Sequence, residues 1–296
     1  MGQSLDGRIA VVTGAGAGLG RAEAIGLAEQ GATVIVNDLG SALEGSDVVD
    51  VINTAGGRAV AVAGDIADAA TATEIMRTAT EELGGLHIVM SNAGVTRDKM
   101  LFNMTDDEWD LVVRVHLRGH FLLNRNAASH WRAESKAAGG PVYGRLINTS
   151  SEAGLLGPEG QANYGAAKAG ITALTLSAAR ALRRYGVRAN AICPRARTQM
   201  TAGVFGNAPT DGVDPLSPEH VVKLVTYLAG PDADEVTGQV FVVYGPNVML
   251  MAAPTIEETF TAGGDAWDSG DLNKALTSYF AGRDAGRTFS ASQLVN

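Results

Sequence analysis

Short apolar runs that alternate with longer helical patterns constrain the fold of this chain more than any other feature. Seven such runs, rich in Val, Ile and Ala, occur at 8–13, 33–38, 59–64, 86–92, 142–150, 187–193 and 239–244. Most are nearly continuous in apolar residues, as in parallel strands buried on both faces. Amphipathic stretches separate them, at roughly 19–30, 45–56, 68–83, 106–134, 163–185 and 217–229. The alternation predicts an α/β fold: a doubly wound, seven-stranded parallel sheet of the Rossmann type with helices on both faces.

The pattern also predicts how the chain is organised. Residues 1–250 are expected to form a single domain of this type. Within it, the segment at about 195–216 is rich in Gly, Pro, Asn and Asp, which is typical of a mobile lid over a ligand. The alternation stops near residue 250. The tail 251–296 contains candidate helices at 255–262 and near 271–281, and we expect it to pack on the same domain as a C-terminal extension.

Composition excludes several classes of function. The chain has 296 residues, of which 46% are hydrophobic and 19% charged, and its net charge is −9. A surface for nucleic acid needs clustered Lys and Arg, so this charge argues against one. The single cysteine, Cys193, allows no internal disulfide and fits a reducing compartment. The first residues lack a signal-peptide layout, and no apolar run reaches about 18 residues. We therefore expect a cytoplasmic protein with no nucleic-acid partner and no membrane insertion.

A glycine-rich turn follows the first expected strand. The segment TGAGAGLG has the spacing T-G-x-x-x-G-x-G, with Gly14, Gly18 and Gly20, whereas a strict G-x-G-x-x-G fails because its sixth position is Leu19. Glycines allow a tight turn and let the backbone approach a pyrophosphate, which the N–H groups of the following helix can bind. The segment therefore favours a dinucleotide site, although a glycine-rich turn without a ligand would have the same sequence.

The ends of the next strands supply further candidates for this site. Asp38 lies 24 residues beyond Gly14, where a carboxylate can accept from the 2′-hydroxyl of an adenosine ribose. Because a carboxylate repels a 2′-phosphate, Asp38 favours NAD over NADP. The third and fourth strands end at Asp65-Ile66 and Asn92-Ala93-Gly94, on the rim where an open α/β sheet binds its ligand. Asp65 could equally cap the helix that starts near Asp68.

Tyr164 and Lys168 are four residues apart in an expected helix, so they share one face, a turn from each other. A neighbouring ammonium group favours the phenolate, and this lowers the pKa of the tyrosine. The fifth strand ends thirteen residues before Tyr164, in a stretch that includes Ser151. A hydroxyl on that rim can donate to a substrate oxygen on which charge develops.

Taken together, these motifs resemble the short-chain dehydrogenase/reductase family. The segments TGAGAGLG, SNAG, Ser151 and YGAAK follow that family's pattern in order and spacing, over about residues 5–245. The resemblance implies that Tyr164 is the general acid/base and that Ser151 orients the carbonyl. It implies that Lys168 lowers the pKa of Tyr164 and binds the nicotinamide ribose. The implied reaction is hydride exchange between NAD and a secondary alcohol or its ketone.

Three departures from the family pattern narrow the resemblance. His116 stands where the family usually has an asparagine that completes a proton relay through a water molecule to the lysine. Pro194 is followed by Arg195, where the family usually has glycine. Thr198, four residues after Pro194 rather than five, takes the position of the hydroxyl that contacts the nicotinamide amide. With VNDLG and GQANYGAAK, these features resemble the (3R)-hydroxyacyl-CoA dehydrogenase domains of peroxisomal multifunctional enzymes of type 2, also known as 17β-hydroxysteroid dehydrogenase type 4. His116 is expected either to hold the relay water or to bond a backbone carbonyl, and His120, one turn on, to be a core or interface residue.

The resemblance favours oxidation of a (3R)-3-hydroxyacyl-CoA to the 3-oxoacyl-CoA. The alternatives are a hydroxysteroid dehydrogenase of the 17β type, a 3-oxoacyl-carrier-protein reductase, and a catalytically idle nucleotide-binding protein. The expected ligands are thus NAD and a small acyl-CoA or steroid, with no metal. The long alanine-rich helices 106–134 and 163–185 pair across a two-fold axis in this family, so a homodimer or homotetramer is expected. The cofactor site is expected to comprise Gly14, Gly18, Leu19, Gly20, Asp38, Asp65, Ile66, Asn92, Ala93, Gly94, Tyr164, Lys168, Pro194 and Thr198, and the catalytic site Ser151, Tyr164, Lys168 and His116.

Overall fold

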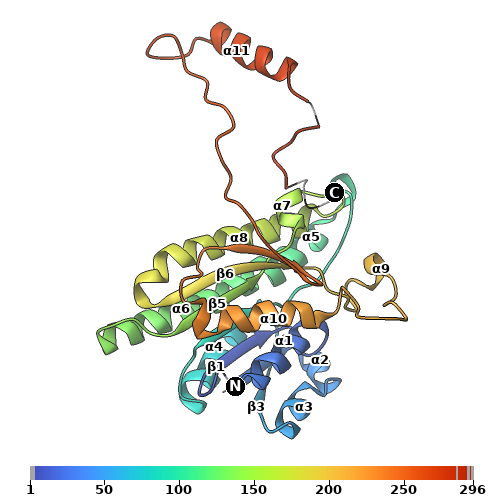
Figure 1. The fold of residues 1–296 in the computed structure, drawn as a ribbon, viewed down its shortest axis with the longest axis vertical. Helices are drawn as coiled ribbons and strands as arrows, with labels where there is room; N and C mark the ends of the chain where they lie inside the picture. Colours follow the sequence, from blue (N-terminus) through green and yellow to red (C-terminus); the bar gives the residue numbers. More distant parts are fainter. Residues whose placement is uncertain (1–3, 285, 292–293, 295–296) are drawn as a thin grey trace. The chain divides into compact units, whose positions relative to one another are not determined.

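A mostly parallel sheet forms the centre of the computed structural model, which describes residues 4–284, 286–291 and 294. Within these residues eight strands pair in the order β3-β2-β1-β4-β5-β6-β7-β8 (Figure 1). The crossover from β3 back past β1 to β4 is the doubly wound arrangement that the sequence predicts. The strands are β1 (Ile9–Thr13), β2 (Thr33–Asp38), β3 (Arg58–Ala63), β4 (Ile88–Ser91), β5 (Gly144–Thr149), β6 (Val187–Pro194), β7 (Val240–Tyr244) and β8 (Asn247–Leu250).

The predicted number of strands, seven, is wrong by one. Strand β8 runs antiparallel to β7, with Tyr244 opposite Asn247 and Phe241 opposite Leu250. A tight turn at Gly245, which has a φ of 48°, reverses the chain between them. The strand has only four residues, most of them exposed, and it begins after a turn of two residues, so its apolar residues are not separated from those of β7 in the sequence.

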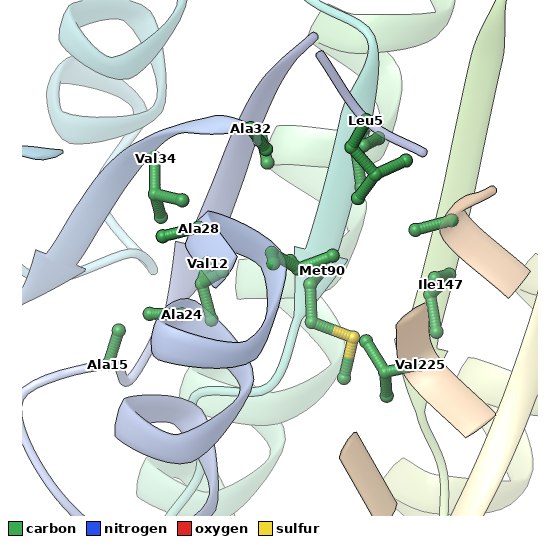
Figure 2. Close-up of a cluster of buried hydrophobic side chains, with 14 of the residues drawn as sticks. Leu5, Val12, Ala15, Ala24, Ala28, Ala32, Val34, Met90, Ile147 and Val225 are labelled. Carbon is green, nitrogen blue, oxygen red and sulfur yellow. The ribbon is translucent and has the colours of Figure 1, made fainter. Parts of the chain in front are cut away.

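Helices cover both faces of the sheet. One face packs against α1, α3 and α10, and the other against α4, α6 and α8. Figure 2 shows Ala24 of α1, Met90 of β4 and Val225 of α10 among the buried side chains of the first of these layers. The α-helices of this domain are α1 (Gly18–Glu29), α2 (Gly40–Glu44), α3 (Val48–Thr54), α4 (Ala69–Arg77), α5 (Asp106–Val113), α6 (Gly119–Ala138), α7 (Ala153–Leu156), α8 (Ala162–Leu182), α9 (Ala202–Phe205) and α10 (Pro218–Ala229).

The long helix expected at 106–134 is interrupted by a wide turn. Between α5 and α6 the chain forms one stretch of π-helix, η3 (Arg114–Arg118), which contains His116. A capping box at Thr105 and Glu108 starts α5, and Gly139, with a φ of 67°, ends α6. A π-turn inside an α-helix is often found at a functional site, because it redirects the side chains of one turn.

The C-terminal tail, Ala252–Asn296, forms a unit separate from the domain Met1–Met251. Its helix α11 (Ser269–Ala281) confirms the one predicted near 271–281. The helix predicted at 255–262 is wrong, since these residues form neither helix nor strand. Its sequence, TIEETFTA, offers few apolar residues to bury, and isolated helices of this length are unstable in water. That the tail packs on the domain stays a prediction.

Candidate active site

A cleft of about 590 Å³ lies at the carboxyl ends of the parallel strands. Every residue that the sequence analysis assigned to the cofactor or catalytic site lines it, except Gly20. The lining therefore includes Gly14, Gly18, Leu19, Asp38, Asp65, Ile66, Asn92, Ala93, Gly94, His116, Ser151, Tyr164, Lys168, Pro194 and Thr198. Residues that are up to 184 positions apart in the chain thus meet at one edge of the sheet because parallel strands end on the same side.

The glycine turn after β1 is shaped by close backbone approach. Gly14 and Gly18 have φ of 66° and 56°, in the left-handed region that favours glycine. A Cβ on Gly14 would lie 2.7 Å from the Cα of Ala93, and one on Gly20 would lie 2.3 Å from the carbonyl oxygen of Gly14. Gly20 therefore packs behind the turn rather than in the cleft. Helix α1 begins here with no side chain capping its first N–H groups, as a site for a pyrophosphate requires.

Asp38 is fixed against this turn at the end of β2. One of its carboxylate oxygens accepts from the Gly16 N–H at 2.9 Å, and the other accepts from the Leu39 N–H at 2.8 Å. A Cβ on Gly16 would lie 3.0 Å from the first of these oxygens, so a glycine here allows the close approach. The carboxylate is thus held in one orientation at the edge of the cleft.

Asp65 lines the cleft, as expected of a cofactor-site residue, but the alternative that it caps a helix is wrong. It does not cap the next helix: α4 begins at Ala69 with Asp68 as its N-cap residue. One oxygen of Asp65 accepts from the Ala67 N–H at 2.8 Å, and the other forms a short ion pair with Arg114, the first residue of the π-turn. The ion pair joins the end of β3 to the wall that carries His116.

Thr13 is a site residue that the sequence analysis did not single out. Its hydroxyl accepts from the Asn92 N–H at 3.0 Å and the Ala93 N–H at 3.1 Å. The Asn92 side chain donates back to the Thr13 carbonyl oxygen at 3.3 Å. These bonds fasten the glycine turn to the end of β4. The first residue of the TGAGAGLG segment is Thr13, so that motif could have indicated its role from the sequence.

Tyr164, Ser151 and Lys168 come together on the far wall of the cleft. The Ser151 hydroxyl lies on the same wall as Tyr164, close enough to lower the pKa of its phenol. The Nζ of Lys168 lies 5.4 Å from the centre of the Tyr164 ring and donates to the Thr149 carbonyl oxygen at 2.6 Å. Lys168 is buried, with 1% of its surface exposed. This confirms the prediction, made from their spacing, that Tyr164 and Lys168 share one face of the helix.

The pKa of Tyr164 is raised in this structure, whereas the sequence led us to expect that the neighbouring lysine lowers it. Burial raises the pKa of Tyr164 above its usual value, and the Ser151 hydroxyl opposes the rise. Burial also lowers the pKa of Lys168 to about 7, so at neutral pH its ammonium charge is only partly present. The neighbouring charge that was expected to stabilise the phenolate is thus weakened by the same burial.

His116 lies beneath this wall with 1% of its surface exposed. Its Nε2 is 2.8 Å from the carbonyl oxygen of Val95 and 3.0 Å from the Val95 N–H, so its tautomer decides which bond forms. Its ring meets the Tyr164 ring edge-on, with 5.1 Å between the ring centres. Burial lowers the pKa of His116 well below its usual value, so the imidazole is neutral at physiological pH. Its Nδ1 has no hydrogen-bond partner in the described part of the chain.

His120 is buried in the domain core rather than exposed in the cleft. Its Nδ1 lies 2.7 Å from the His116 carbonyl oxygen, one turn back along the helix. Burial lowers its pKa to about 3, so Nδ1 carries a proton as a neutral donor to that carbonyl. His120 therefore satisfies a backbone group at the π-turn.

The segment expected to form a lid begins at the floor of the cleft. Thr198 lies beside the glycine turn, since a Cβ on Gly18 would be 3.4 Å from it. Arg197 holds the two ends of the segment together: it forms an ion pair with Asp214 at 2.9 Å and donates to the Phe205 carbonyl oxygen at 2.6 Å. Pro194, Thr198 and neighbouring residues line the cleft. That the segment moves as a lid stays a prediction.

Comparisons with known proteins agree with this geometry. The family model for short chain dehydrogenase matches residues 8–207. Hydroxyacyl-CoA dehydrogenase ChsB1 of Mycobacterium tuberculosis is 64% identical over 98% of this chain and 94% of its own length. Peroxisomal multifunctional enzyme type 2 of Mus musculus is 40% identical over 78% of this chain, which corresponds to 31% of that larger protein. A crystal structure of a short chain dehydrogenase from Mycobacterium avium superposes with a TM-score of 0.86 at 41% identity, covering 97% of this chain and 99% of that one.

Proposed function

Because the chain belongs to the short-chain dehydrogenase/reductase family, whose members are oxidoreductases acting on CH–OH groups, we propose that it oxidises (3R)-3-hydroxyacyl-CoA thioesters to 3-oxoacyl-CoA with NAD. The observation that carries this proposal is the constellation of Ser151, Tyr164 and Lys168 at the wall of a cleft that also contains a glycine turn and Asp38. The choice of thioester rests on the similarity to a hydroxyacyl-CoA dehydrogenase along nearly the whole chain.

The residues of the cleft fit a nicotinamide dinucleotide. The glycines with positive φ have no side chains to cover the backbone of the turn, and no side chain caps the first N–H groups of α1. A pyrophosphate can therefore approach the turn and accept hydrogen bonds from these N–H groups. Asp38 would accept from the adenosine ribose, and Lys168 and Thr198 would contact the nicotinamide half. Once bound, the dinucleotide supplies the hydride acceptor of the reaction.

The protein side of the reaction is proton transfer. Tyr164 as phenolate takes the proton of the substrate hydroxyl onto its Oη, while the Ser151 hydroxyl donates to the same substrate oxygen and orients it. Lys168 as ammonium favours the phenolate. His116, neutral and bonded to Val95, holds the wall that faces the Tyr164 ring.

The experiment that tests the function is a substrate panel with purified protein and NAD. The (3R)- and (3S)-3-hydroxyacyl-CoA isomers, the matching carrier-protein thioester and a 17β-hydroxysteroid are compared by NADH absorbance. We expect the (3R) thioester to be turned over and Tyr164→Phe to abolish the reaction. Turnover of the steroid with none of the thioester would replace this proposal by the hydroxysteroid alternative.

The preference for NAD is tested at Asp38. A carboxylate about 5 Å from a 2′-phosphate, at an effective dielectric constant near 40–80, repels it by about 1–3 kcal/mol, or roughly 5- to 150-fold in affinity. Asp38→Asn should narrow the ratio of kcat/KM for NAD over NADP by that factor. A wild-type protein that prefers NADP would refute the role given to Asp38.

We further propose that the protein is a cytoplasmic homo-oligomer. Helix α8 supports this because it exposes small residues, among them Ala166, Ala169 and Ala173, along the face turned away from the sheet. A close-packed pair of helices can use such a face. Sedimentation equilibrium distinguishes monomer, dimer and tetramer, and a monomer at micromolar concentration would contradict the proposal. No helix in the described residues has the length and apolarity needed to cross a membrane.

A further inference from the structure

Arg195 stands where this family usually has a glycine, directly after β6, and it forms a partly buried network there. Its Nε and Nη2 donate to the two carboxylate oxygens of Glu152, both at 2.6 Å. The side chains of Arg195 and Glu152 are 26% and 15% exposed. The guanidinium carbon of Arg195 lies 4.4 Å from the centre of the Tyr244 ring, and its backbone N–H donates to Val243 at 2.9 Å. One side chain thus joins the ends of the three neighbouring strands β5, β6 and β7.

This network lies directly behind Ser151. Glu152 is the next residue and the N-cap position of α7. In the same turn, the Ser151 hydroxyl accepts from the Ala153 N–H at 3.1 Å, and its carbonyl oxygen accepts from the Gly154 N–H at 3.0 Å. The orientation of the Ser151 hydroxyl therefore depends on the conformation of the turn that Glu152 anchors.

The turn is also pressed against the helix that carries Lys168. A Cβ on Gly154 would lie 2.6 Å from the backbone nitrogen of Ala169 and 2.8 Å from the carbonyl carbon of Lys168. A shift of the turn would therefore be transmitted to α8 as well as to Ser151. Neither Glu152 nor Arg195 lines the cleft, so both can affect the reaction only through other residues.

The chemistry of the pair suits orientation better than stability. Removing two charges even partly from water costs free energy that their attraction often only balances, so such an ion pair is weak support for a fold. A two-bonded arginine–carboxylate fork, in contrast, fixes the relative position of the two chain segments that carry it. The bonds from Glu152 raise the pKa of Arg195, so the guanidinium charge is always present.

We propose that Glu152 and Arg195 are positioning residues for the reaction, which act as one unit to hold the Ser151 hydroxyl toward Tyr164. The inference rests on the proposed role of Ser151. Because a misplacement of about 1 Å in a reacting group costs up to 100-fold in rate, loss of the pair lowers kcat far more than it raises KM.

The test compares Arg195→Met, Glu152→Gln and the double variant with wild type, with (3R)-3-hydroxyacyl-CoA and NAD as substrates. Each single variant is expected to lose about tenfold or more in kcat, with KM changed by less than about threefold. The kcat of the double variant should be no lower than that of the less active single variant, because the two residues act as a unit. Arg195→Lys should rescue little, since an ammonium cannot donate to both oxygens in the same fork. If a single variant folds poorly because one partly buried charge is left unpaired, the double variant still carries the comparison.

Asp234→Asn is the matched control. It removes a carboxylate that pairs with both Arg145 and Arg188, each at 3.1 Å. Arg145 lies at the start of β5, the end of the strand away from the cleft. This control should lower the melting temperature without changing kcat. Equal kcat in wild type and both single variants, losses that simply add in the double variant, or the same kcat loss in the control would each overturn the proposal.

A second measurement needs no substrate and separates this proposal from the proposed function. The ionisation of Tyr164 is followed by ultraviolet difference absorbance, with Tyr164→Phe as the blank. Because the Ser151 hydroxyl opposes the raised pKa of Tyr164, Ser151→Ala should raise that pKa further. Glu152→Gln should raise it in the same direction, and an unchanged Tyr164 titration would refute the positioning role. This result holds whichever alcohol the substrate panel identifies.

Discussion

Replacement of His116 by Ala and by Asn gives the most direct test of how the cleft is held in shape. The imidazole fills a buried site, bonds the Val95 backbone at 2.8 Å and contacts the Tyr164 ring with its edge. Leaving one buried backbone group unpaired costs about 1–3 kcal/mol, and the aromatic contact contributes about 0.5–1.5 kcal/mol. We therefore expect His116→Ala to lower the free energy of unfolding by about 2–4 kcal/mol.

The same change should lower kcat by about 10- to 100-fold, because Val95 and Tyr164 both line the cleft and lose a shared neighbour. His116→Asn keeps a side chain that can bond the Val95 backbone, so its kcat should stay within about threefold of wild type. Because burial keeps the imidazole neutral, the pH dependence of kcat above about pH 6.5 should be the same in wild type and His116→Asn.

Urea unfolding gives the stability of each variant, and steady-state rates of NADH formation between pH 6.5 and 9 give kcat. Measurements at 25 °C keep the Ala variant folded if the domain has ordinary stability. A His116→Ala protein that is less stable but has wild-type kcat would refute the argument, and would make His116 a core residue without a role in the reaction.

Two further predictions concern buried contacts next to the site. Glu23 has 0% exposure, and neither carboxylate oxygen has a partner among the residues that the structure describes, so burial raises its pKa well above the usual value. The stability that the neutral Glu23 carboxyl allows is fully present below the pKa of about 4.3 that it has in the unfolded chain, and it is lost as the pH rises through its raised pKa in the folded protein. Glu23→Gln should therefore stabilise the protein more at pH 8 than at pH 5. Equal effects in urea at both pH values would contradict this. A Cβ on Gly94 would lie 2.1 Å from Cε1 of His116, so Gly94→Ala should cost about 1–3 kcal/mol and lower kcat. The added cost should disappear in a His116→Ala background, and additive costs would argue against the clash.

Much of the fold follows from local sequence, and the differences have physical causes. All seven parallel strands were predicted, because strands buried on both faces must be continuously apolar. The edge strand β8 was missed because it is short and follows β7 after a turn of two residues, so its apolar residues were not separated from that strand. The π-turn was also missed, since an amphipathic pattern at 106–134 fits a straight helix equally well.

The residues of the cleft were predictable for a related reason. Ser151, Tyr164 and the glycine turn lie at strand or helix ends, where position along the chain determines position on the rim. The contacts that depend on tertiary packing were not predictable. Arg195 and Glu152 are 43 residues apart, and nothing in either local sequence indicates that they form an ion pair. Likewise, Glu23 lies on a helix whose charged residues would ordinarily face water, and only the packing of that helix shows that this carboxyl is buried.

The π-turn at Arg114–Arg118 has a consequence for how this site can change over evolutionary time. Such a turn inside an α-helix corresponds to one additional residue in the chain. Deleting a single residue there restores regular α-helix and leaves the flanking helices in almost the same relative rotation, because the wide turn and an α-turn both cover about one turn of helix. α6 would keep its packing against α4, but the side chains of the turn itself would be redirected, among them His116, which lines the cleft. Relatives that place a side chain at the same point of the cleft should therefore also share the residue count between the end of β4 and α6.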